Sequence, residues 1–276
     1  ALWLKNQGFE VDFAPVNEKG FVDVEALADL IRPDTTLISI MAVNNEIGSV
    51  QPIEAISKLL ADKPTISFHV DAVQALAKIP TEKYLTERVD FATFSSHKFH
   101  GVRGVGFVYI KSGKKITPLL TGGGQERDYR STTENVAGIA ATAKALRLSM
   151  EKLDIFRSKT GQMQAVIRQA LLDYPDIFVF SDEEDFAPHI LTFGIKGVRG
   201  EVIVHAFEDY DIFISTTSAC SSKAGKPAGT LIAMGVDKDK AQSAVRLSLD
   251  LENDMSQVEQ FLTKLKLIYN QTRKVR

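Results

Sequence analysis

The chain has 276 residues, of which 44% are hydrophobic and 25% are charged, values that are ordinary for a globular protein with a sizeable core. At roughly 150 residues per domain, this length predicts about two domains. The net charge of −2 and the shortness of the basic tail at 273–276 argue against nucleic acid as a direct ligand. The longest apolar runs are too short to span a bilayer, which argues against a membrane protein. Cys220 is the only cysteine, which excludes an intrachain disulfide and favours a reducing, cytoplasmic setting.

Strands and helices alternate through the first half of the chain. The pattern predicts helices over 23–31, 53–61 and 72–78, and strands over 36–43, 65–70, 89–94 and 106–110. The run 36–43 is continuously apolar and rich in β-branched residues, which indicates a strand that is buried on both faces. Strands separated by helices predict a mostly parallel sheet with helices on both faces.

The pattern changes after the three glycines at 122–124. Helical periodicity dominates 135–172, and the remainder predicts strands over 177–180, 189–195 and 245–249 and helices over 201–210 and 256–271. We therefore predict a large α/β domain over residues 1–145 and a smaller α+β domain over residues 146–276.

Polar side chains follow the predicted parallel strands. In open parallel sheets, ligands bind outside the carboxyl ends of the strands, so these side chains are expected to converge on one edge. The convergence of amides, an acid, a hydroxyl, an imidazole and a lysine predicts a ligand site, and the residues concerned are Asn45, Asp71, Gln74, Ser95, His97 and Lys98.

Each of these residues also has a purely structural explanation. Asp71 could cap a following helix, and Asn45 could be a turn residue. Lys98 could be a solvated lysine, which is the usual state of that residue type. His97 and His100 stand three residues apart, but no third ligand lies near them in sequence, so we expect no metal site.

Cys220 allows two interpretations. A lone cysteine is usually a small buried hydrophobe. Its neighbours from 215 to 225, however, are mostly Ser, Thr, Ala and Gly, a composition typical of a surface loop rather than of a core element. An accessible thiol near Lys223 could reach its reactive thiolate form, and this second interpretation is the one that we favour.

Five segments, in this order, resemble the cysteine desulfurases, which are pyridoxal-phosphate (PLP) enzymes of the class V aminotransferase superfamily. They are VNNEIG at 43–48, HVDAVQ at 69–74, SSHKFHG at 95–101, GGGQER at 122–127 with RSTTEN at 130–135, and SACSS at 218–222. The resemblance runs from end to end and implies the fold type I architecture of PLP-dependent transferases, a mostly parallel sheet with helices on both faces and a smaller α+β domain.

The same resemblance implies a role for each candidate residue. Lys98 would form the covalent imine bond to PLP and later move protons at the substrate Cα, as a lysine in a sheltered pocket can. Asp71 would pair with the ring nitrogen and Gln74 with the phenolic oxygen, while Ser95 and His97 would hold the phosphate.

The remaining implied roles concern the substrate and the partners. Asn45 would contact the cofactor. Together with Arg246, it would also bind the carboxylate of L-cysteine. Thr133 would reach the phosphate in a partner subunit, which implies a homodimer. Cys220 would take the sulfur, giving L-alanine and a persulfide that passes to an acceptor, either an iron–sulfur scaffold or a tRNA-thiolation enzyme.

Two departures from the family pattern bear on these roles. Thr132 stands where the family usually has Gly, a costly replacement if the position requires a positive φ. The family's upstream phosphate loop and its ring-stacking histidine do not occur here, so we expect an N-terminally incomplete chain. The alternatives are a class V aminotransferase, a selenocysteine lyase or a truncated, non-catalytic chain, and Cys220 argues against the aminotransferase.

Overall fold

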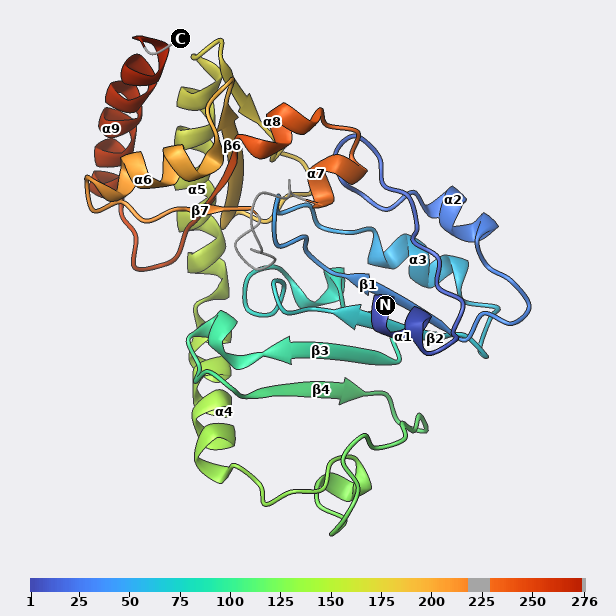
Figure 1. Ribbon diagram of the computed structural model, residues 1–276. Helices are drawn as coiled ribbons and strands as arrows, with labels where there is room; N and C mark the ends of the chain where they lie inside the picture. Colours follow the sequence, from blue (N-terminus) through green and yellow to red (C-terminus); the bar gives the residue numbers. More distant parts are fainter. Residues whose placement is uncertain (218–228, 275–276) are drawn as a thin grey trace. The chain divides into compact units, whose positions relative to one another are not determined.

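The computed structural model describes residues 1–217 and 229–274, which fall into two compact units. Unit 1 comprises Ala1–Thr35, Val43–Pro52 and Phe156–Arg276, and unit 2 comprises Thr36–Ala42 and Ile53–Ile155. The chain therefore passes between the units several times, whereas the domains predicted from the sequence were separated by one boundary. Those two domains therefore stay a prediction. Figure 1 labels most of the helices and strands of both units.

Unit 2 is built on a four-stranded sheet in the order β1-β2-β3-β4. The first three strands are parallel and β4 is antiparallel to β3, as the predicted mostly parallel sheet requires. The strands are β1 (Leu37–Met41), β2 (Ser67–Asp71), β3 (Phe91–Ser95) and β4 (Gly106–Ile110).

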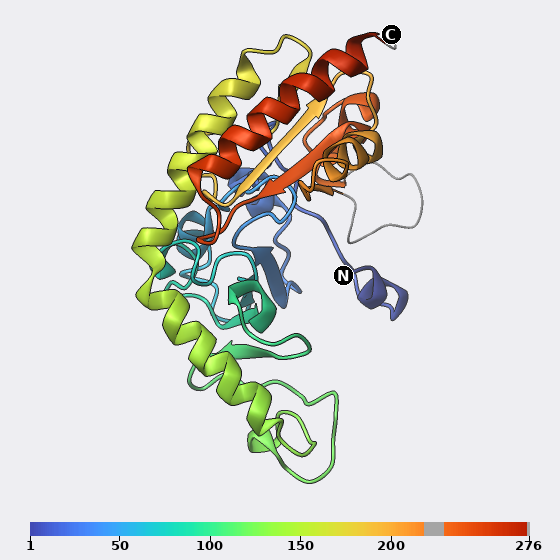
Figure 2. The same ribbon diagram turned by 90° about the vertical axis from the view of Figure 1, so that its left-hand side faces the viewer.

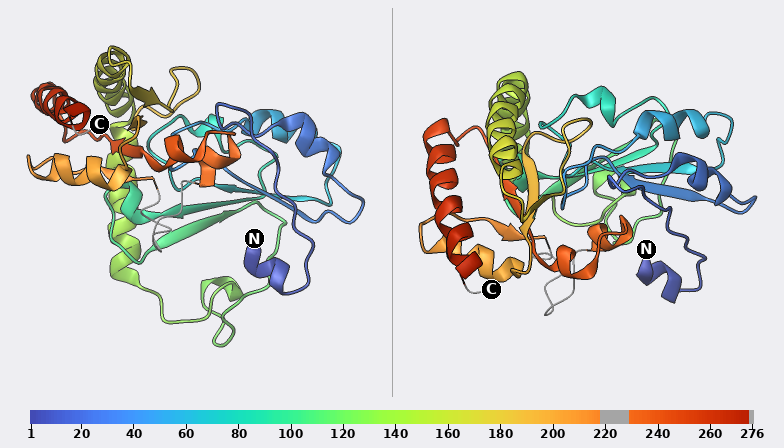
Figure 3. Two further views of the ribbon diagram at one scale, coloured as in Figure 1. Left: turned by 45° about the horizontal axis from the view of Figure 1, so that its top comes forward. Right: turned by 90° about the horizontal axis from the view of Figure 1, so that it is seen from above.

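Burial alternates along β1, β2 and β3, so that the sheet has one buried and one open face. The buried face carries aliphatic and aromatic side chains such as Phe68 and Val70, and Figure 3 shows α3 on one side of the strands. The prediction that β1 is buried on both faces is wrong, because Leu37 is 50% exposed and Met41 40% exposed. An apolar run indicates a strand, but it does not determine whether a layer covers each face.

The helices of unit 2 are α3 (Ile53–Leu59), α4 (Val136–Glu151) and the 3-10 turns η1 (Thr81–Lys83), η2 (Ser96–Phe99) and η3 (Glu126–Asp128). The helix predicted over 72–78 does not form. Consecutive turns take its place, with Ala75 N and Leu76 N both donating to Ala72 O. Ala77 has φ 59°, and this left-handed conformation is incompatible with continuing a right-handed helix.

A buried carboxylate fixes the beginning of β3. Asp90 accepts from the backbone N–H of Phe68 on β2 at 2.9 Å and pairs with Arg88 at 2.8 Å and Lys114 at 3.3 Å. Burial by itself would raise the pKa of Asp90, but these hydrogen bonds and cations outweigh it, so the pKa lies below its ordinary value. Asp90 thus ties β2, β3 and the segment after β4 together at the end opposite the carboxyl ends of the parallel strands.

Unit 1 contains a second, antiparallel sheet in the order β5-β6-β8-β7. Its strands are β5 (Ile177–Val179), β6 (Ile190–Ile195), β7 (Ser215–Thr216) and β8 (Ala244–Ser248). The helices assigned to this unit are α1 (Leu2–Asn6), α2 (Val24–Asp29), α6 (Gly200–Glu208), α7 (Gly229–Ala233), α8 (Lys238–Gln242), α9 (Met255–Lys274) and, from Phe156 onward, α5 (Leu153–Leu172). Among the described residues, no helix has both the length and the hydropathy needed to cross a bilayer.

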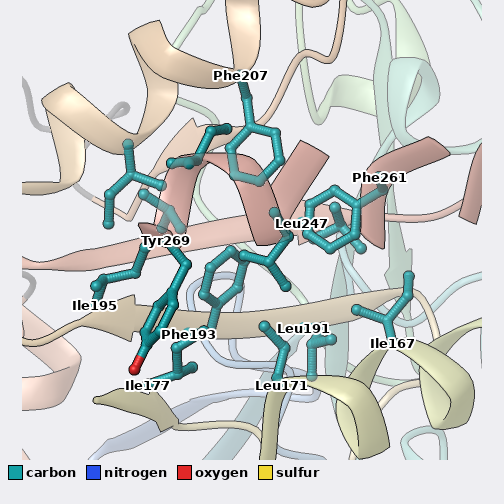
Figure 4. Close-up of a cluster of buried hydrophobic side chains, with 14 of the residues drawn as sticks. Ile167, Leu171, Ile177, Leu191, Phe193, Ile195, Phe207, Leu247, Phe261 and Tyr269 are labelled. Atoms are coloured by element: carbon teal, nitrogen blue, oxygen red, sulfur yellow. The ribbon is translucent and has the colours of Figure 1, made fainter. Parts of the chain in front are cut away.

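The core of unit 1 is formed by this sheet and the helices α5, α6 and α9. Figure 2 shows α5 and α9 running alongside the sheet. Three phenylalanines from different elements meet there, as Figure 4 shows. The rings of Phe207 and Phe261 stack with their centroids 4.9 Å apart, and Phe193 meets Phe261 edge-on at 6.2 Å. Phe261 therefore connects α9 to both α6 and β6.

We expect Phe261→Ala to lower the free energy of unfolding by about 3–5 kcal/mol, because it removes a buried ring and leaves a cavity. Phe261 is 3% exposed, whereas Phe213 is 78% exposed, so Phe213→Ala is the matched control and should change stability by at most about 0.5 kcal/mol. Urea unfolding followed by circular dichroism measures both variants. Equal stabilities for the two would contradict the assigned core.

Candidate active site

The carboxyl ends of β2 and β3 carry the first group of predicted site residues. Asp71 is the last residue of β2 and lies opposite Met41 of β1 and Thr93 of β3. Its Oδ1 accepts from the backbone N–H of Val73 at 3.1 Å, so it does cap the following turn. The side chain is exposed, and within the described part of the chain its Oδ2 makes no hydrogen bond. Capping and ligand binding are therefore compatible at Asp71.

Gln74 lies in the hydrogen-bonded turns that follow Asp71 and is half-buried. Because these turns replace the expected helix, Gln74 stands one turn beyond the strand end rather than on a helical face. The structure thus keeps Asp71 and Gln74 close together along the chain at the carboxyl end of β2.

The turn that follows β3 presents the second group. Ser96 and Phe99 are buried and anchor η2 to α4: Ser96 Oγ lies 2.8 Å from Thr142 Oγ1, and Ser149 Oγ donates to Phe99 O at 3.2 Å. The residues between and before these anchors remain accessible, since His97 is exposed and Ser95 and Lys98 are half-buried. The turn therefore fixes its backbone through Ser96 and Phe99 and leaves Ser95, His97 and Lys98 for ligands.

A glycine allows this turn to close. The N–H of Gly101 donates to Ser96 O at 2.9 Å, and a Cβ at Gly101 would lie 1.9 Å from Ser96 Oγ. Only glycine fits there without displacing the hydroxyl that contacts Thr142. Gly101 thus has a steric reason to be glycine, although its sequence context alone indicates only a turn.

Unit 1 carries another group of predicted site residues, Asn45 and Arg246. The turn after β1 brings Asn45 and Arg246 together, since Arg246 Nη1 donates to Asn45 O at 2.8 Å. Arg246 stands on β8, where it pairs with Thr192 of β6 and Ser215 of β7. Asn45 does lie in a turn, so its structural explanation also holds. Both predicted carboxylate-binding residues therefore occupy one place in the same unit.

Three consecutive carbonyls hold this turn. Besides the bond to Asn45 O, Glu46 O accepts from Thr192 Oγ1 at 2.5 Å and Ile47 O accepts from Ser181 Oγ at 2.6 Å. Inside the turn, the buried Asn44 Oδ1 accepts from the N–H groups of Glu46 and Ile47 at 2.8 and 3.0 Å. Thr192, Ser181 and Asn44 were not predicted as site residues, and nothing in the local sequence of the first two indicates this role.

Cys220 lies outside the described residues, but the elements on either side of it belong to unit 1. β7 precedes it and pairs with β8 at Arg246. α7 follows it, and Thr230 lies near the start of this helix. Thr230 Oγ1 accepts a hydrogen bond from Asn44 Nδ2, and the Thr230 N–H donates to Glu46 Oε2, each at 3.2 Å. The chain thus enters and leaves 218–228 beside the residues that surround Asn45 and Arg246.

Thr133 is exposed and precedes α4. Its segment, 112–135, extends from β4 on the side away from β3 (Figure 1), so the structure does not bring it to the ends of β2 and β3. Thr132 is not among the residues with positive φ, whereas Glu126, Arg127 and Asp128 all are. The β-branched Thr132 therefore incurs no left-handed backbone strain.

The model of the family "Aminotransferase class-V" matches residues 2–261. A "NifS/IcsS protein homolog" of Lactobacillus delbrueckii subsp. bulgaricus is 49% identical over 99% of this chain and 71% of its own length. "Cysteine desulfurase IscS" of Clostridium botulinum is 37% identical over 100% of this chain and 70% of its own length.

Solved structures agree with these relatives. A "NIFS-LIKE PROTEIN" superposes with a TM-score of 0.89 at 36% identity, covering 98% of this chain and 70% of that one. A NifS-like protein from Rickettsia africae superposes with a TM-score of 0.87 at 29% identity, covering 98% and 72%. The chain belongs to the class-V aminotransferase family, and within it to the cysteine desulfurases, which confirms the family and the fold class predicted from the sequence.

We expect Gly101→Ala to lower the free energy of unfolding by about 1–3 kcal/mol, because the added methyl group must displace Ser96 and loosen the turn from α4. Gly161→Ala on α5 is the control. A Cβ there has Pro188 Cβ as its nearest neighbour at 3.9 Å, so this variant should be neutral or stabilised by up to about 1 kcal/mol. In thermal melts the midpoint of Gly101→Ala should fall below the wild-type value and that of Gly161→Ala should lie at or above it. An unchanged Gly101→Ala protein would refute the steric argument.

Proposed function

We propose that this protein removes sulfur from L-cysteine with the help of PLP, giving L-alanine and a persulfide on Cys220. The observation that carries the proposal is the placement of Asp71 and of the Ser95–Lys98 turn at the carboxyl ends of neighbouring parallel strands. Membership of the cysteine desulfurases supports the reaction type.

The side chains at the ends of β2 and β3 fit PLP chemically. Asp71 offers a carboxylate oxygen to the cationic ring nitrogen, and Lys98 offers an amine to the aldehyde. Ser95 and His97 offer short polar contacts to the phosphate, and Gln74 an amide to the phenolic oxygen. When bound, PLP withdraws electrons from the Cα of the amino acid attached to it.

The protein's own groups then bind the substrate and move its protons. Arg246 and Asn45 hold the carboxylate of L-cysteine, for which the planar guanidinium is well suited. The half-buried Lys98 amine removes the proton from the substrate Cα and returns it when alanine is released. A carboxylate at Asp71 keeps the ring nitrogen protonated, which maintains the electron demand at Cα.

Cys220 accepts the sulfur. Its thiolate attacks the substrate sulfur, and an S–S bond forms as the bond between the substrate Cβ and sulfur breaks. Cβ keeps the electron pair of the broken bond and takes up a proton, which makes it the methyl group of alanine. The product is a Cys220 persulfide. In the sequence Cys220 stands between β7 and α7, both of which belong to unit 1 with Asn45 and Arg246.

The partners follow from the same proposal. We infer a homodimer in which Thr133 contacts the phosphate bound by the partner, consistent with its exposure on a segment beyond β4. The persulfide passes to an iron–sulfur scaffold or to a tRNA-thiolation enzyme. A reducing compartment such as the cytoplasm would keep the single thiol active between cycles.

We expect Cys220→Ser to retain the visible absorption of bound PLP and to lose release of alanine and sulfide from L-cysteine in the presence of a thiol reductant. Lys98→Ala should no longer attach PLP covalently, and its rate of alanine release should fall by at least about a hundredfold. Lys144→Ala, which changes an exposed lysine on α4, is the control and should behave like wild type.

Borohydride reduction and peptide mapping identify the attached lysine, and alanine is measured directly. Labelling of a lysine other than Lys98 would exclude the site assignment. Undiminished desulfuration by Cys220→Ser would exclude the persulfide mechanism. Amino-group transfer to a keto acid by that variant would favour the aminotransferase alternative. Turnover of selenocysteine, but not of cysteine, by the wild-type protein would favour the selenocysteine lyase.

We expect Arg246→Lys to raise the KM for L-cysteine by about tenfold to a hundredfold, because a point charge replaces the guanidinium fork and loses the bond to Asn45 O. The absorption of bound PLP should not change, since no cofactor contact is removed. Arg199→Lys is the control, because Arg199 is exposed and its carboxylate neighbour lies 3.9 Å away. An unaltered KM for Arg246→Lys would remove Arg246 from the substrate site.

A further inference from the structure

A histidine that the proposed function leaves without a role links three strands directly below the cofactor residues. His69 lies in the middle of β2 on the open face of the unit 2 sheet. Its Nδ1 is 2.7 Å from Ser39 Oγ on β1, and its Nε2 is 3.1 Å from Thr93 Oγ1 on β3. Both ring nitrogens therefore make hydrogen bonds, each to a different neighbouring strand.

This chain of hydrogen bonds lies on the face of the sheet that also carries Asp71 and Ser95. Successive side chains of a strand alternate between faces, so His69 and Asp71 share a face, as do Thr93 and Ser95. Two residues of a strand span about 6.6 Å, so Asp71 lies about that far beyond His69 along β2, and Ser95 about that far beyond Thr93 along β3. Thr93 is opposite Asp71 in the register, so the bond from His69 to Thr93 runs diagonally toward the end of the sheet that carries the proposed cofactor residues.

Backbone pairing between β2 and β3 ends before it reaches Ser95. The register of the two strands ends with Asp71 opposite Thr93, and Ala72 N donates to Thr93 O at 3.0 Å. Ser95 lies beyond this last pair and is held by β4, where it faces Gly106. The bond between His69 and Thr93 is therefore the side-chain connection next to the point at which β2 and β3 part.

The imidazole suits this place as a neutral group. Burial lowers the pKa of His69, and the nearby carboxylate of Asp71 only partly offsets this. A hydroxyl can donate or accept, so Ser39 and Thr93 satisfy a neutral imidazole in either tautomer. A neutral ring leaves the charge of Asp71 uncompensated, as pairing with a cationic ring nitrogen requires.

We propose that His69 is a positioning residue whose bonds to Ser39 and Thr93 set the spacing of β2 and β3 below Asp71 and Ser95, and so place the two anchoring points of PLP. This inference rests on the proposed function, because it assumes that those two residues hold the cofactor. It assigns to His69 no contact with substrate. The link from His69 to Thr93 carries the effect, and the link to Ser39 supports the orientation of the ring.

Substitutions at His69 separate the two links. His69→Leu removes both bonds. In His69→Asn the amide nitrogen takes a position near that of Nδ1 and can keep the bond to Ser39, whereas in His69→Gln the longer side chain reaches toward the position of Nε2 and can keep the bond to Thr93. Thr93→Val removes the hydroxyl from the other side and preserves the shape of the side chain.

The experiment measures PLP dissociation and the absorption spectrum of bound PLP for the purified holoenzyme and each variant. We expect His69→Leu and Thr93→Val to weaken PLP binding by about tenfold and to shift the absorption maximum, since each removes a hydrogen bond that places the cofactor residues. His69→Gln should remain closer to wild type than His69→Asn. His205→Leu is the control, because His205 is an exposed imidazole on α6 that bonds to Glu208.

Two results would overturn the inference while the proposed function stands: normal PLP binding and an unchanged spectrum in both His69→Leu and Thr93→Val, or a loss confined to His69→Leu. If His69→Leu fails to fold, PLP binding by Thr93→Val and the comparison of His69→Gln with His69→Asn test the inference instead. Failure of the wild-type protein to attach PLP at Lys98 would instead overturn the proposed function, and the role of His69 with it.

Discussion

The register of the three parallel strands in unit 2 is the constraint on which the candidate cofactor site depends. Side chains alternate along a strand, so a slip of one residue in β2 would turn Phe68 and Val70 to the open face and bury His69 and Asp71. The apolar face prevents this slip, because Phe68 and Val70 are completely buried. The polar row at the carboxyl ends is therefore held in place by hydrophobic burial on the other side of the same strands.

The same alternation explains how far the sequence could predict this unit. Short apolar runs followed by polar residues are visible in the sequence, and they locate both the strands and the residues Asp71, Ser95 and Lys98 at their ends. Whether a second layer covers β1 is not visible, because Leu37 and Met41 are apolar and yet exposed. The turns at 72–78 were also missed, because nothing in an alanine-rich segment indicates that Ala77 adopts a positive φ.

The residues around Asn45 pose a different problem. The partners of this turn lie far away along the chain: Ser181 is 134 residues from Ile47, Thr192 is 146 from Glu46, and Arg246 is 201 from Asn45. No periodicity or local motif connects them, so only the resemblance to a family paired Asn45 with Arg246. Thr192 and Ser181 have no chemistry of their own in the proposed reaction. They act by satisfying carbonyls that would otherwise be buried without a donor, a requirement that only the folded chain reveals.

The predicted site residues of the two units thus differ in what holds them in place. In unit 2 the cofactor residues are placed by local structure, a strand end and a short turn whose anchors Ser96 and Phe99 contact one helix. In unit 1 the carboxylate-binding turn is placed by side chains that meet only when β6 and β8 have paired. Long-range contacts of this kind form at a higher entropic cost than local ones. Asn45 and Arg246 therefore depend on the complete fold of unit 1, whereas Asp71 and Lys98 depend on the sheet of unit 2 alone.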